Sequence, residues 1–278
     1  MTTAQHHPHP ATAAGSAATP APVAPGSRAP VALVTGAGRR IGRAIALALA
    51  RAGWDVAVHY RASQAEAREV AAAIEALGRR AVTLDCDLAD EAAVRQLVPR
   101  AVAALGALDC VVNNASLFDY DCAADFTVAR LEAHMRANVA APILLAQALH
   151  GATPDGAQAA VINLLDQKLY NLNPDFLSYT LSKAALQTAT TVLAQQLAPR
   201  LRVVGVAPGI TMVSGEQTEA GFALAHQQTP LGRSSTPDDI AAAVVYAAGA
   251  RALTGTTLLV DGGQHLMPLA RDVMFLAQ

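Results

Sequence analysis

Three side chains that could carry out proton chemistry stand close together in the middle of the chain: Asp166, Tyr179 and Lys183. Tyr179 and Lys183 are four residues apart, so on a helix they share one face and the ammonium lies under the phenol. A free phenol with a pKa of about 10 is a poor proton donor or acceptor at neutral pH, and a neighbouring cation favours its anionic form. The pair is therefore a candidate general acid/base, although exposed helix faces carry the same spacing without any chemistry.

The segments around this pair alternate between short apolar runs and longer alanine-rich or amphipathic stretches. The short runs are typical of strands covered on both faces, and we expect strands at 31–35, 55–59, 81–85, 108–112, 159–164, 202–206 and 257–260. The longer stretches predict helices ending near 52, over 63–77, 90–105, 128–150 and 178–197, and starting near 237. Repeated strand–helix units predict an α/β fold, a doubly wound parallel sheet with helices on both faces.

The polar residues that could do chemistry follow the ends of these expected strands. In such a sheet, ligands bind beyond the carboxyl ends of the strands. Six strands in turn are followed by Gly36 to Gly42, Arg61, Asp87, Asn113 to Ser116, Asp166, and Pro208 with Gly209. The sequence therefore predicts that these residues converge on one crevice, together with Tyr179 and Lys183.

The first expected strand leads into a glycine-rich turn, Gly36-Ala37-Gly38-Arg39-Arg40-Ile41-Gly42, which precedes a helix. Glycines at such a turn let backbone N–H groups approach a pyrophosphate, and the positive end of the helix dipole favours the charge. The position of the glycines between a strand and a helix indicates a dinucleotide site.

The second expected strand ends in His59-Tyr60-Arg61-Ala62-Ser63. A site for NAD usually has an acidic residue here that binds the ribose 2′-hydroxyl, and this chain has none. Arg61, Ser63 and Arg40 could bind a 2′-phosphate, to which arginine forms charge-assisted hydrogen bonds. The sequence favours NADP, with NADPH as the reduced form; the alternative is that Arg61 only caps a solvated loop.

The composition is that of one globular domain preceded by a polar segment. The chain has 278 residues, 53% of them hydrophobic, and a net charge of −2, so we expect one domain over 31–278. Residues 1–30 are mostly small or polar and cannot offset the entropy of ordering, so we expect a disordered extension. The basic residues are scattered, which argues against nucleic acid as a partner, and no apolar run approaches the ~18 residues of a membrane span.

The three cysteines, Cys86, Cys110 and Cys122, lack the C-x-x-C spacing of a zinc site. Cys86 and Cys110 lie in apolar runs, where a reduced core thiol is the expected role. We therefore expect no metal site and a reducing, cytoplasmic environment.

Taken together, these motifs resemble the short-chain dehydrogenase/reductase family over roughly residues 31 to 265. The matching residues are Thr35 to Gly42, Asp87-Leu88, Asn113-Asn114-Ala115, Asn138, Tyr179 with Lys183, Pro208-Gly209 and Asp261-Gly262-Gly263. The resemblance implies a Rossmann-like sheet of seven strands, a homotetramer and hydride transfer with a nicotinamide cofactor. It also implies that Tyr179 donates the proton, that Lys183 binds the nicotinamide ribose and tunes Tyr179, and that Asn138 belongs to a proton relay.

One difference from the usual family pattern makes the chain resemble, in particular, the pteridine reductase branch of the family. The family usually has a serine where this chain has Asp166, and an ionised aspartate cannot donate a hydrogen bond to a substrate carbonyl. Beside the phenol, Asp166 is expected to share a proton with Tyr179, which suits protonation of nitrogen in a C=N reduction. The branch also has counterparts of Arg40, of His59-Tyr60 and of Asn113-Asn114-Ala115-Ser116-x-Phe118. It implies that Ser116 lies near the cofactor phosphates and the pterin, and that Phe118 stacks on the ring.

Several alternatives remain open. Asp166 could be a local substitution in a carbonyl reductase for a 3-oxoacyl or other small ketone substrate, and Phe118 could only pack against its loop. A third possibility is an NADP-binding regulatory protein without turnover. We expect residues 211–233 to form a loop with a short helix that closes over the substrate, and His226 to lie on the surface. The apolar tail, 264–278, predicts a subunit interface, and the branch has an arginine near Arg271 that reaches a neighbouring site.

Overall fold

The computed structural model of the chain describes residues 28–213 and 217–275. The predicted N-terminal extension therefore lies outside the described residues except for its last three. The first of these, Arg28, donates to both carboxylate oxygens of Asp109, at 2.6 and 2.7 Å. Asp109 also accepts from the backbone N–H of Val31 at 2.8 Å, so this contact fixes the point at which the domain begins.

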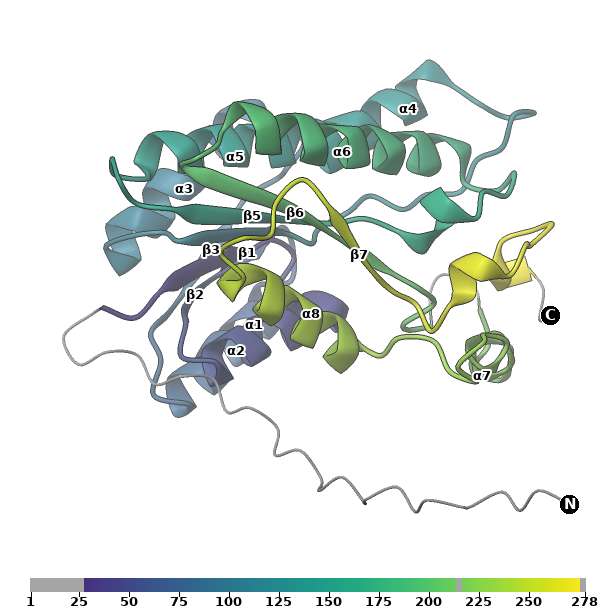
Figure 1. Ribbon diagram of the computed structural model, residues 1–278, viewed down its shortest axis with the longest axis horizontal. Coiled ribbons are helices and arrows are strands. Elements are labelled where there is room, and N and C mark those ends of the chain that lie inside the picture. Colours follow the sequence, from purple (N-terminus) through teal and green to yellow (C-terminus); the bar gives the residue numbers. More distant parts are fainter. Residues whose placement is uncertain (1–27, 214–216, 276–278) are drawn as a thin grey trace, which may run out of the picture.

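Seven parallel strands form one sheet in the order β3-β2-β1-β4-β5-β6-β7, which confirms the predicted doubly wound architecture (Figure 1). The central strands are short runs of branched apolar residues, buried on both faces, as expected for a covered parallel sheet. The strands are β1 (Val31–Val34), β2 (Asp55–Tyr60), β3 (Ala81–Asp85), β4 (Cys110–Asn113), β5 (Ala159–Leu164), β6 (Leu201–Pro208) and β7 (Thr257–Val260).

Helices cover both faces of the sheet (Figure 1). On one face, Ile45 and Leu49 of α1 and Ile240 of α8 pack on the sheet in one hydrophobic core. On the other face, Leu97 of α3 and Leu145 of α5 contribute to a second core. The helices are α1 (Arg40–Arg51), α2 (Gln64–Ala76), α3 (Glu91–Leu105), α4 (Val128–Met135), α5 (Ala141–Ala152), α6 (Leu177–Gln196), α7 (Glu219–Gln227) and α8 (Pro237–Gly249).

The single helix predicted over 128–150 is wrong in one respect. A π-helical segment, Arg136–Ala140, separates α4 from α5. Pro142 follows at the start of α5, and a proline has no N–H to donate to the carbonyl of residue 138 and clashes with it in a regular helix. The wider turn therefore relieves this conflict, and it places the side chain of Asn138 among buried residues.

The remaining differences from the expected elements are small and lie at their ends. β4 starts at Cys110 rather than at 108, although the backbone of Asp109 already forms hydrogen bonds with Val31 and Ala160 on either side. β6 continues to Pro208, where its last residues pair with β7. The short helix expected between 216 and 228 is α7, and residues 214–216 lie outside the described part.

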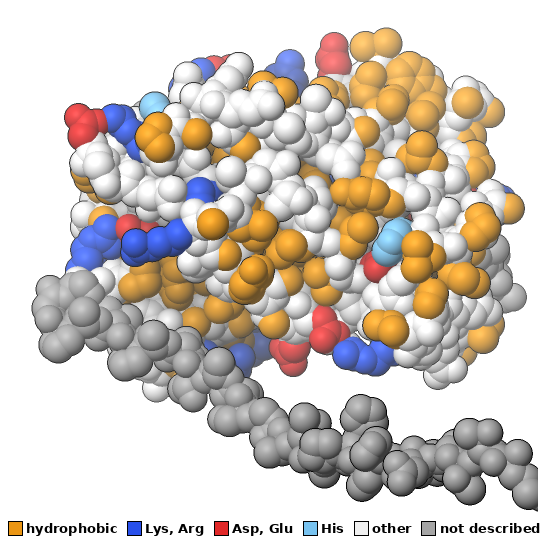
Figure 2. Space-filling view, viewed as in Figure 1, with side chains coloured by type: hydrophobic (Ala, Val, Ile, Leu, Met, Phe, Trp, Pro, Cys, Tyr) orange, Lys and Arg blue, Asp and Glu red, His pale blue; other side chains and the backbone are white. Residues whose placement is uncertain are grey.

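The visible surface mixes charges of both signs. Figure 2 shows Lys and Arg side chains interspersed with Asp and Glu side chains over one face of the molecule. Among the described helices, none has the length and the apolar character that crossing a membrane requires.

Candidate active site

Two neighbouring cavities open at the carboxyl ends of the strands. The first has a volume of about 440 Å³ and includes Asp166, Tyr179 and Lys183 in its wall. The second has a volume of about 720 Å³ and lies beside the glycine-rich turn that joins β1 to α1. Arg40, Ile41, Asn114 and Ser116 line both cavities. Together the cavities form the crevice predicted from the ends of the strands.

The glycine-rich turn is held in place by a buried histidine. Nδ1 of His59 accepts a hydrogen bond from the backbone N–H of Gly36 at 3.0 Å, and Nε2 lies 3.0 Å from the carbonyl oxygen of Cys86. The second contact needs a proton on Nε2, so the ring is neutral with that nitrogen as the donor. Burial lowers the pKa of His59 to about 4, which agrees with a neutral ring. His59 thus supports the backbone of the turn as well as lining the second cavity.

The turn is too tight for any side chain at position 42. A Cβ at Gly42 would lie 2.2 Å from the carbonyl oxygen of Gly36 and 2.6 Å from Nδ2 of Asn114. Gly36 itself has a φ of +62°, in the left-handed region that glycine favours. The backbone can therefore approach a ligand closely at the N-terminus of α1, and the turn fits the pyrophosphate of a dinucleotide.

The second cavity also carries positive charge. Arg39, Arg40 and Arg61 all line it, and Arg61 is exposed. Arg39 forms an ion pair with Glu66, and Nη1 of Arg40 donates to the carbonyl oxygen of Val213 at 2.7 Å. The charge and the volume of this cavity fit a phosphorylated nucleotide.

The structure brings most of the predicted cofactor and substrate residues to these cavities, and leaves three away from them. The second cavity is lined by Gly36, Gly42, His59, Arg61, Asp87, Leu88 and Ala115. The first is lined by Phe118, Asp166, Tyr179, Lys183, Pro208 and Gly209. Neither wall includes Tyr60, which is buried in the hydrophobic core, Ser63, which lies against the glycine turn, or Asn138.

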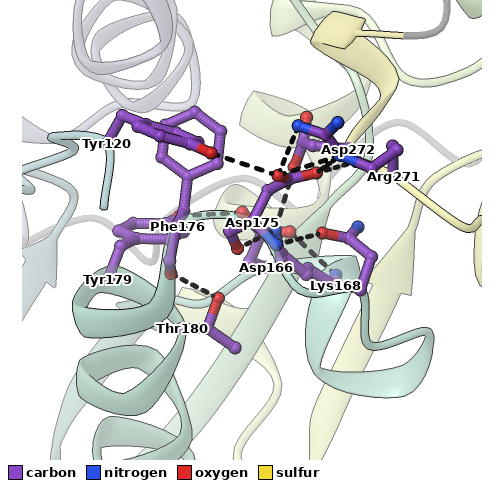
Figure 3. Close-up of polar contacts among 10 residues, drawn as sticks. Tyr120, Asp166, Lys168, Asp175, Phe176, Tyr179, Thr180, Arg271 and Asp272 are labelled. Carbon is purple, nitrogen blue, oxygen red and sulfur yellow. Dashed lines mark hydrogen bonds and ion pairs between the residues drawn. The ribbon is translucent and has the colours of Figure 1, made fainter. Parts of the chain in front are cut away.

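Tyr179 and Asp166 are joined by a direct hydrogen bond. Oη of Tyr179 donates to Oδ2 of Asp166 at 2.7 Å, and Oδ1 accepts from the backbone N–H of Lys168 at 2.8 Å (Figure 3). Lys183 lies one turn further along α6, where its Nζ is 5.6 Å from the centre of the Tyr179 ring and donates to the carbonyl oxygen of Leu164 at 2.7 Å. The three side chains thus form one connected group at the end of β5.

Burial changes the proton affinities of this group. It raises the pKa of Asp166, although the hydrogen bonds from Lys168 and Tyr179 act to lower this pKa. Burial and the neighbouring Asp166 raise the pKa of Tyr179 well above its usual value. The sequence predicts the opposite direction, because the spacing shows only the cation at Lys183. Burial also lowers the pKa of Lys183 to about 8. The phenol therefore keeps its proton at neutral pH.

Asn138 joins two segments of the site from the π-helical turn. Its Oδ1 accepts from the backbone N–H of Leu117 at 2.7 Å, and its Nδ2 donates to the carbonyl oxygen of Leu117 at 2.9 Å and to Oγ of Ser182 at 3.0 Å. Ser116 also lies within 3.3 Å of Oδ1. Asn138 thus holds the segment after β4 against α6, between Tyr179 and Lys183.

Aromatic rings surround the phenol on the side of the substrate cavity. Phe118 stacks on Phe176 with ring centres 4.3 Å apart, and meets the Tyr179 ring edge-on at 4.6 Å. Phe118 is 38% exposed and lines the first cavity, so part of its ring remains available to a ligand. Phe176 has a φ of +57°, which is uncommon for a bulky residue and strains the backbone just before α6.

The C-terminal segment forms part of the wall of the first cavity. Arg271 forms two hydrogen bonds at 2.8 Å to the carboxylate of Asp175, and Nζ of Lys168 lies 3.1 Å from Oδ2 of Asp272 (Figure 3). Asp272 and Val273 line the first cavity. The described part of the tail contacts its own chain, and the subunit interface expected for it stays a prediction.

Four residues around the site could not be found from the sequence, since each meets its partner only after folding: Lys168, Asp175, Phe176 and Asp272. The first three lie in the stretch between Asp166 and the start of α6, and Asp272 lies in the C-terminal segment. His226, expected on the surface, is half-buried against the carbonyl oxygen of Ser235. Within the described residues, no group of three or more potential ligands could hold a metal ion.

Asp121 fixes the start of the helix that carries Tyr179. This fully buried carboxylate accepts from the backbone N–H of Ser178 at 2.8 Å and from its hydroxyl, and the Asp121 carbonyl accepts from the N–H of Leu177 at 3.1 Å. An Asp121→Ala variant leaves two buried donors without an acceptor, so we expect urea titration to show a loss of about 2 kcal/mol in the free energy of unfolding.

The matched control for this variant is Asp119→Ala, which changes an exposed aspartate of the same loop and is expected to stay within about 0.5 kcal/mol of the wild type. Equal stability of the two variants would show that Asp121 does not fix the helix.

Comparison with known proteins agrees with this geometry. Residues 36–265 match the family model described as enoyl-(acyl carrier protein) reductase. The FolM alternative dihydrofolate reductase 1 from Brucella canis, complexed with NADP, is 39% identical with a TM-score of 0.83, over 87% of this chain and 96% of that one. An uncharacterized oxidoreductase of Methylorubrum extorquens is 37% identical over 84% of this chain and 96% of its own.

A 3-oxoacyl-[acyl-carrier-protein] reductase, FabG, of Staphylococcus aureus is 34% identical over 84% of this chain and 98% of its own length. The relatives thus include a protein named as a dihydrofolate reductase and one named as a 3-oxoacyl reductase, and each match covers more than four fifths of this chain. On the family model, the relatives and the site geometry, this chain belongs to the short-chain dehydrogenase/reductase family.

Proposed function

We propose that this protein is an NADPH-dependent reductase of dihydropteridines, which reduces a C=N bond of the ring to the tetrahydro form. The observation that carries the proposal is the 2.7 Å hydrogen bond from Tyr179 to Asp166. A serine at this position donates a hydrogen bond to a carbonyl substrate, whereas Asp166 accepts one from the phenol and holds the phenolic proton in place. The similarity to a FolM alternative dihydrofolate reductase supports the same substrate class.

The proton part of the reaction follows from the residues in place. NADPH, when bound, supplies the hydride that adds to the carbon of the C=N bond. The electron pair of that bond moves to nitrogen, and Tyr179 gives its proton to this nitrogen. Lys183, held by the Leu164 carbonyl, stabilises the phenolate that remains, and Asp166 orients the phenol, which regains its proton from solvent after turnover. Phe118 offers an aromatic face on which a flat bicyclic ring can stack.

The direct test is the oxidation of NADPH in the presence of a 7,8-dihydropterin, followed at 340 nm, with the tetrahydropterin identified as the product. We expect turnover with the dihydropterin and stoichiometric product. Absence of turnover with dihydrobiopterin, dihydromonapterin and dihydrofolate would contradict the proposal.

The second candidate is reduction of a 3-oxoacyl or other small ketone substrate. The similarity to FabG favours it. It requires Asp166 to be protonated, because only then can this side chain donate to a carbonyl oxygen, and burial raises its pKa in that direction. Turnover of a 3-oxoacyl thioester faster than of any dihydropterin would select this candidate.

We expect the protein to prefer NADPH to NADH because arginines line the second cavity, Arg61 among them. An Arg61→Ala variant removes a charge-assisted hydrogen bond to the 2′-phosphate, so we expect Kd for NADPH to rise about tenfold while Kd for NADH stays unchanged. Fluorescence titration with both nucleotides measures the two values. The control is Arg68→Ala, an exposed arginine of α2 outside the cavity wall. Equal increases in Kd for NADPH and for NADH in Arg61→Ala would show that Arg61 does not bind the 2′-phosphate.

A further inference from the structure

The far end of the substrate cavity carries hydrogen-bond acceptors from two distant parts of the chain. Gln167 follows Asp166 directly, and Asp272 comes from the C-terminal segment; both line the first cavity. Lys168 links the two regions, because its Nζ lies 3.1 Å from Oδ2 of Asp272. The acceptors therefore share a wall with the proton-donating pair.

The side-chain amide of Gln167 has an oxygen that no described residue binds. The residue is 7% exposed, and its Oε1 is buried and has no hydrogen-bond partner among the described residues. A buried polar atom without a partner costs free energy, about 1–3 kcal/mol, and such atoms are rare in native structures. Since the side chain lines the cavity, rotation of its amide would turn Oε1 toward a ligand N–H, which would supply the missing hydrogen bond.

Asp272 is held at the wall by its neighbours. Its backbone N–H donates to Oδ2 of Asp175 at 2.8 Å, and the same carboxylate binds Arg271. The Asp272 side chain is 14% exposed and pairs with Lys168, which is 3% exposed (Figure 3). A carboxylate oxygen can accept more than one hydrogen bond, so Asp272 can bind Lys168 and a ligand at once.

The cations of this wall are already engaged within the protein. Nζ of Lys168 donates to the carbonyl oxygen of Asp175 at 2.6 Å as well as contacting Asp272, and Nζ of Lys183 donates to Leu164. Gln167 and Asp272 therefore offer a ligand two acceptors, and Gln217, whose Nε2 has no partner among the described residues, adds a donor elsewhere in the same wall. A substrate whose edge carries adjacent N–H groups matches such a wall, and one with a carbonyl in their place does not.

We propose that Gln167 and Asp272 form an acceptor pair that selects substrates by the amino group and ring N–H of a 2-aminopyrimidinone edge. This inference rests on the proposed function. It adds that the protein recognises the pteridine by its pyrimidine half. The Arg271–Asp175 contact acts as a positioning device, because it holds Asp272 at the cavity.

The test compares two ligands that differ only at that edge. 6-Methylpterin carries the 2-amino group, and 6-methyllumazine has an oxygen in its place. Isothermal titration of the NADP⁺ complex measures both Kd values without turnover. We expect the wild type to prefer the pterin at least about tenfold, and Gln167→Leu and Asp272→Leu, which remove the acceptor oxygens, each to reduce this preference to below about threefold. Gln167→Glu keeps an acceptor oxygen and is expected to retain the preference.

The control is Gln147→Leu, the same change at an exposed glutamine of α5 outside the cavity, which is expected to leave both Kd values unchanged. Thermal unfolding and Kd for NADPH check that each variant is folded. The inference would be overturned if Gln167→Leu and the Asp272 variant both kept the wild-type preference for the pterin. Equal binding of the two ligands by the wild type would also overturn it. Binding preference without turnover of any dihydropterin would contradict the proposed function and leave the acceptor pair standing.

Discussion

Tyr179→Phe should lower kcat for dihydropterin reduction by about 10²–10⁴-fold while Kd for NADPH stays within about threefold of the wild type. The variant keeps the ring, its edge-on contact with Phe118 and its burial, and removes only the hydroxyl that bonds to Asp166. The loss is expected in kcat rather than in binding, because the proton is needed only when charge develops on the substrate nitrogen. Stopped-flow oxidation of NADPH under saturating substrate measures the effect.

Tyr120→Phe is the matched control for this prediction. Tyr120 belongs to the same group of aromatic rings, but its hydroxyl lies 3.5 Å from Asp175 and it does not line the substrate cavity. We expect its kcat to stay within about threefold of the wild type. Comparable losses in the two variants would mean that the aromatic packing, and not the phenolic proton, limits the reaction.

Asp166→Asn should lower kcat/KM for the dihydropterin by about 10²-fold or more, and should move the alkaline limb of the pH profile to lower pH. In the wild type, burial lowers the pKa of Lys183 to about 8, and the charge of Asp166 acts in the opposite direction. Activity is therefore expected to fall as the pH rises through about 8, since Lys183 then loses the proton that stabilises the phenolate.

The direction of the shift in Asp166→Asn follows from the sign of this interaction. A negative carboxylate favours the charged ammonium, so its loss lowers the pKa of Lys183 further. Measuring kcat/KM from pH 5 to 10 in the wild type and in Asp166→Asn locates the alkaline limb of each enzyme. An alkaline limb that stays in place in Asp166→Asn would show that Asp166 and Lys183 are not coupled in the working enzyme.

The architecture and the crevice could be predicted from the sequence because their signals are local. Each strand is a short apolar run, and each group of polar residues follows the end of one strand, as with Gly36 to Gly42 after β1. Parallel topology then brings those ends together. Asp166 follows the end of β5 in the same way, but its significance came from the resemblance to the family, whose members usually have a serine at this place, thirteen residues before Tyr179.

The features that could not be predicted depend on contacts between distant residues. Arg271 and Asp175 are 96 positions apart, and neither shows its partner in the sequence. The direction of the Tyr179 pKa depends on burial and on the actual approach of Asp166, which the spacing to Lys183 does not reveal. The π-helical turn at Asn138 depends on Pro142, which could have been noticed as an interruption within the expected helix.

The role of Asp166 is decided by the ratio of kcat/KM for a 7,8-dihydropterin to kcat/KM for a 3-oxoacyl thioester, measured in the wild type and in Asp166→Ser. We expect the wild type to favour the dihydropterin by about 10²-fold or more, because the aspartate supports protonation of nitrogen. We expect Asp166→Ser to reverse the preference, because a serine hydroxyl can donate to a carbonyl oxygen. A wild type that favours the thioester, with a ratio that Asp166→Ser leaves unchanged, would contradict a pteridine reductase in which Asp166 supports protonation of nitrogen.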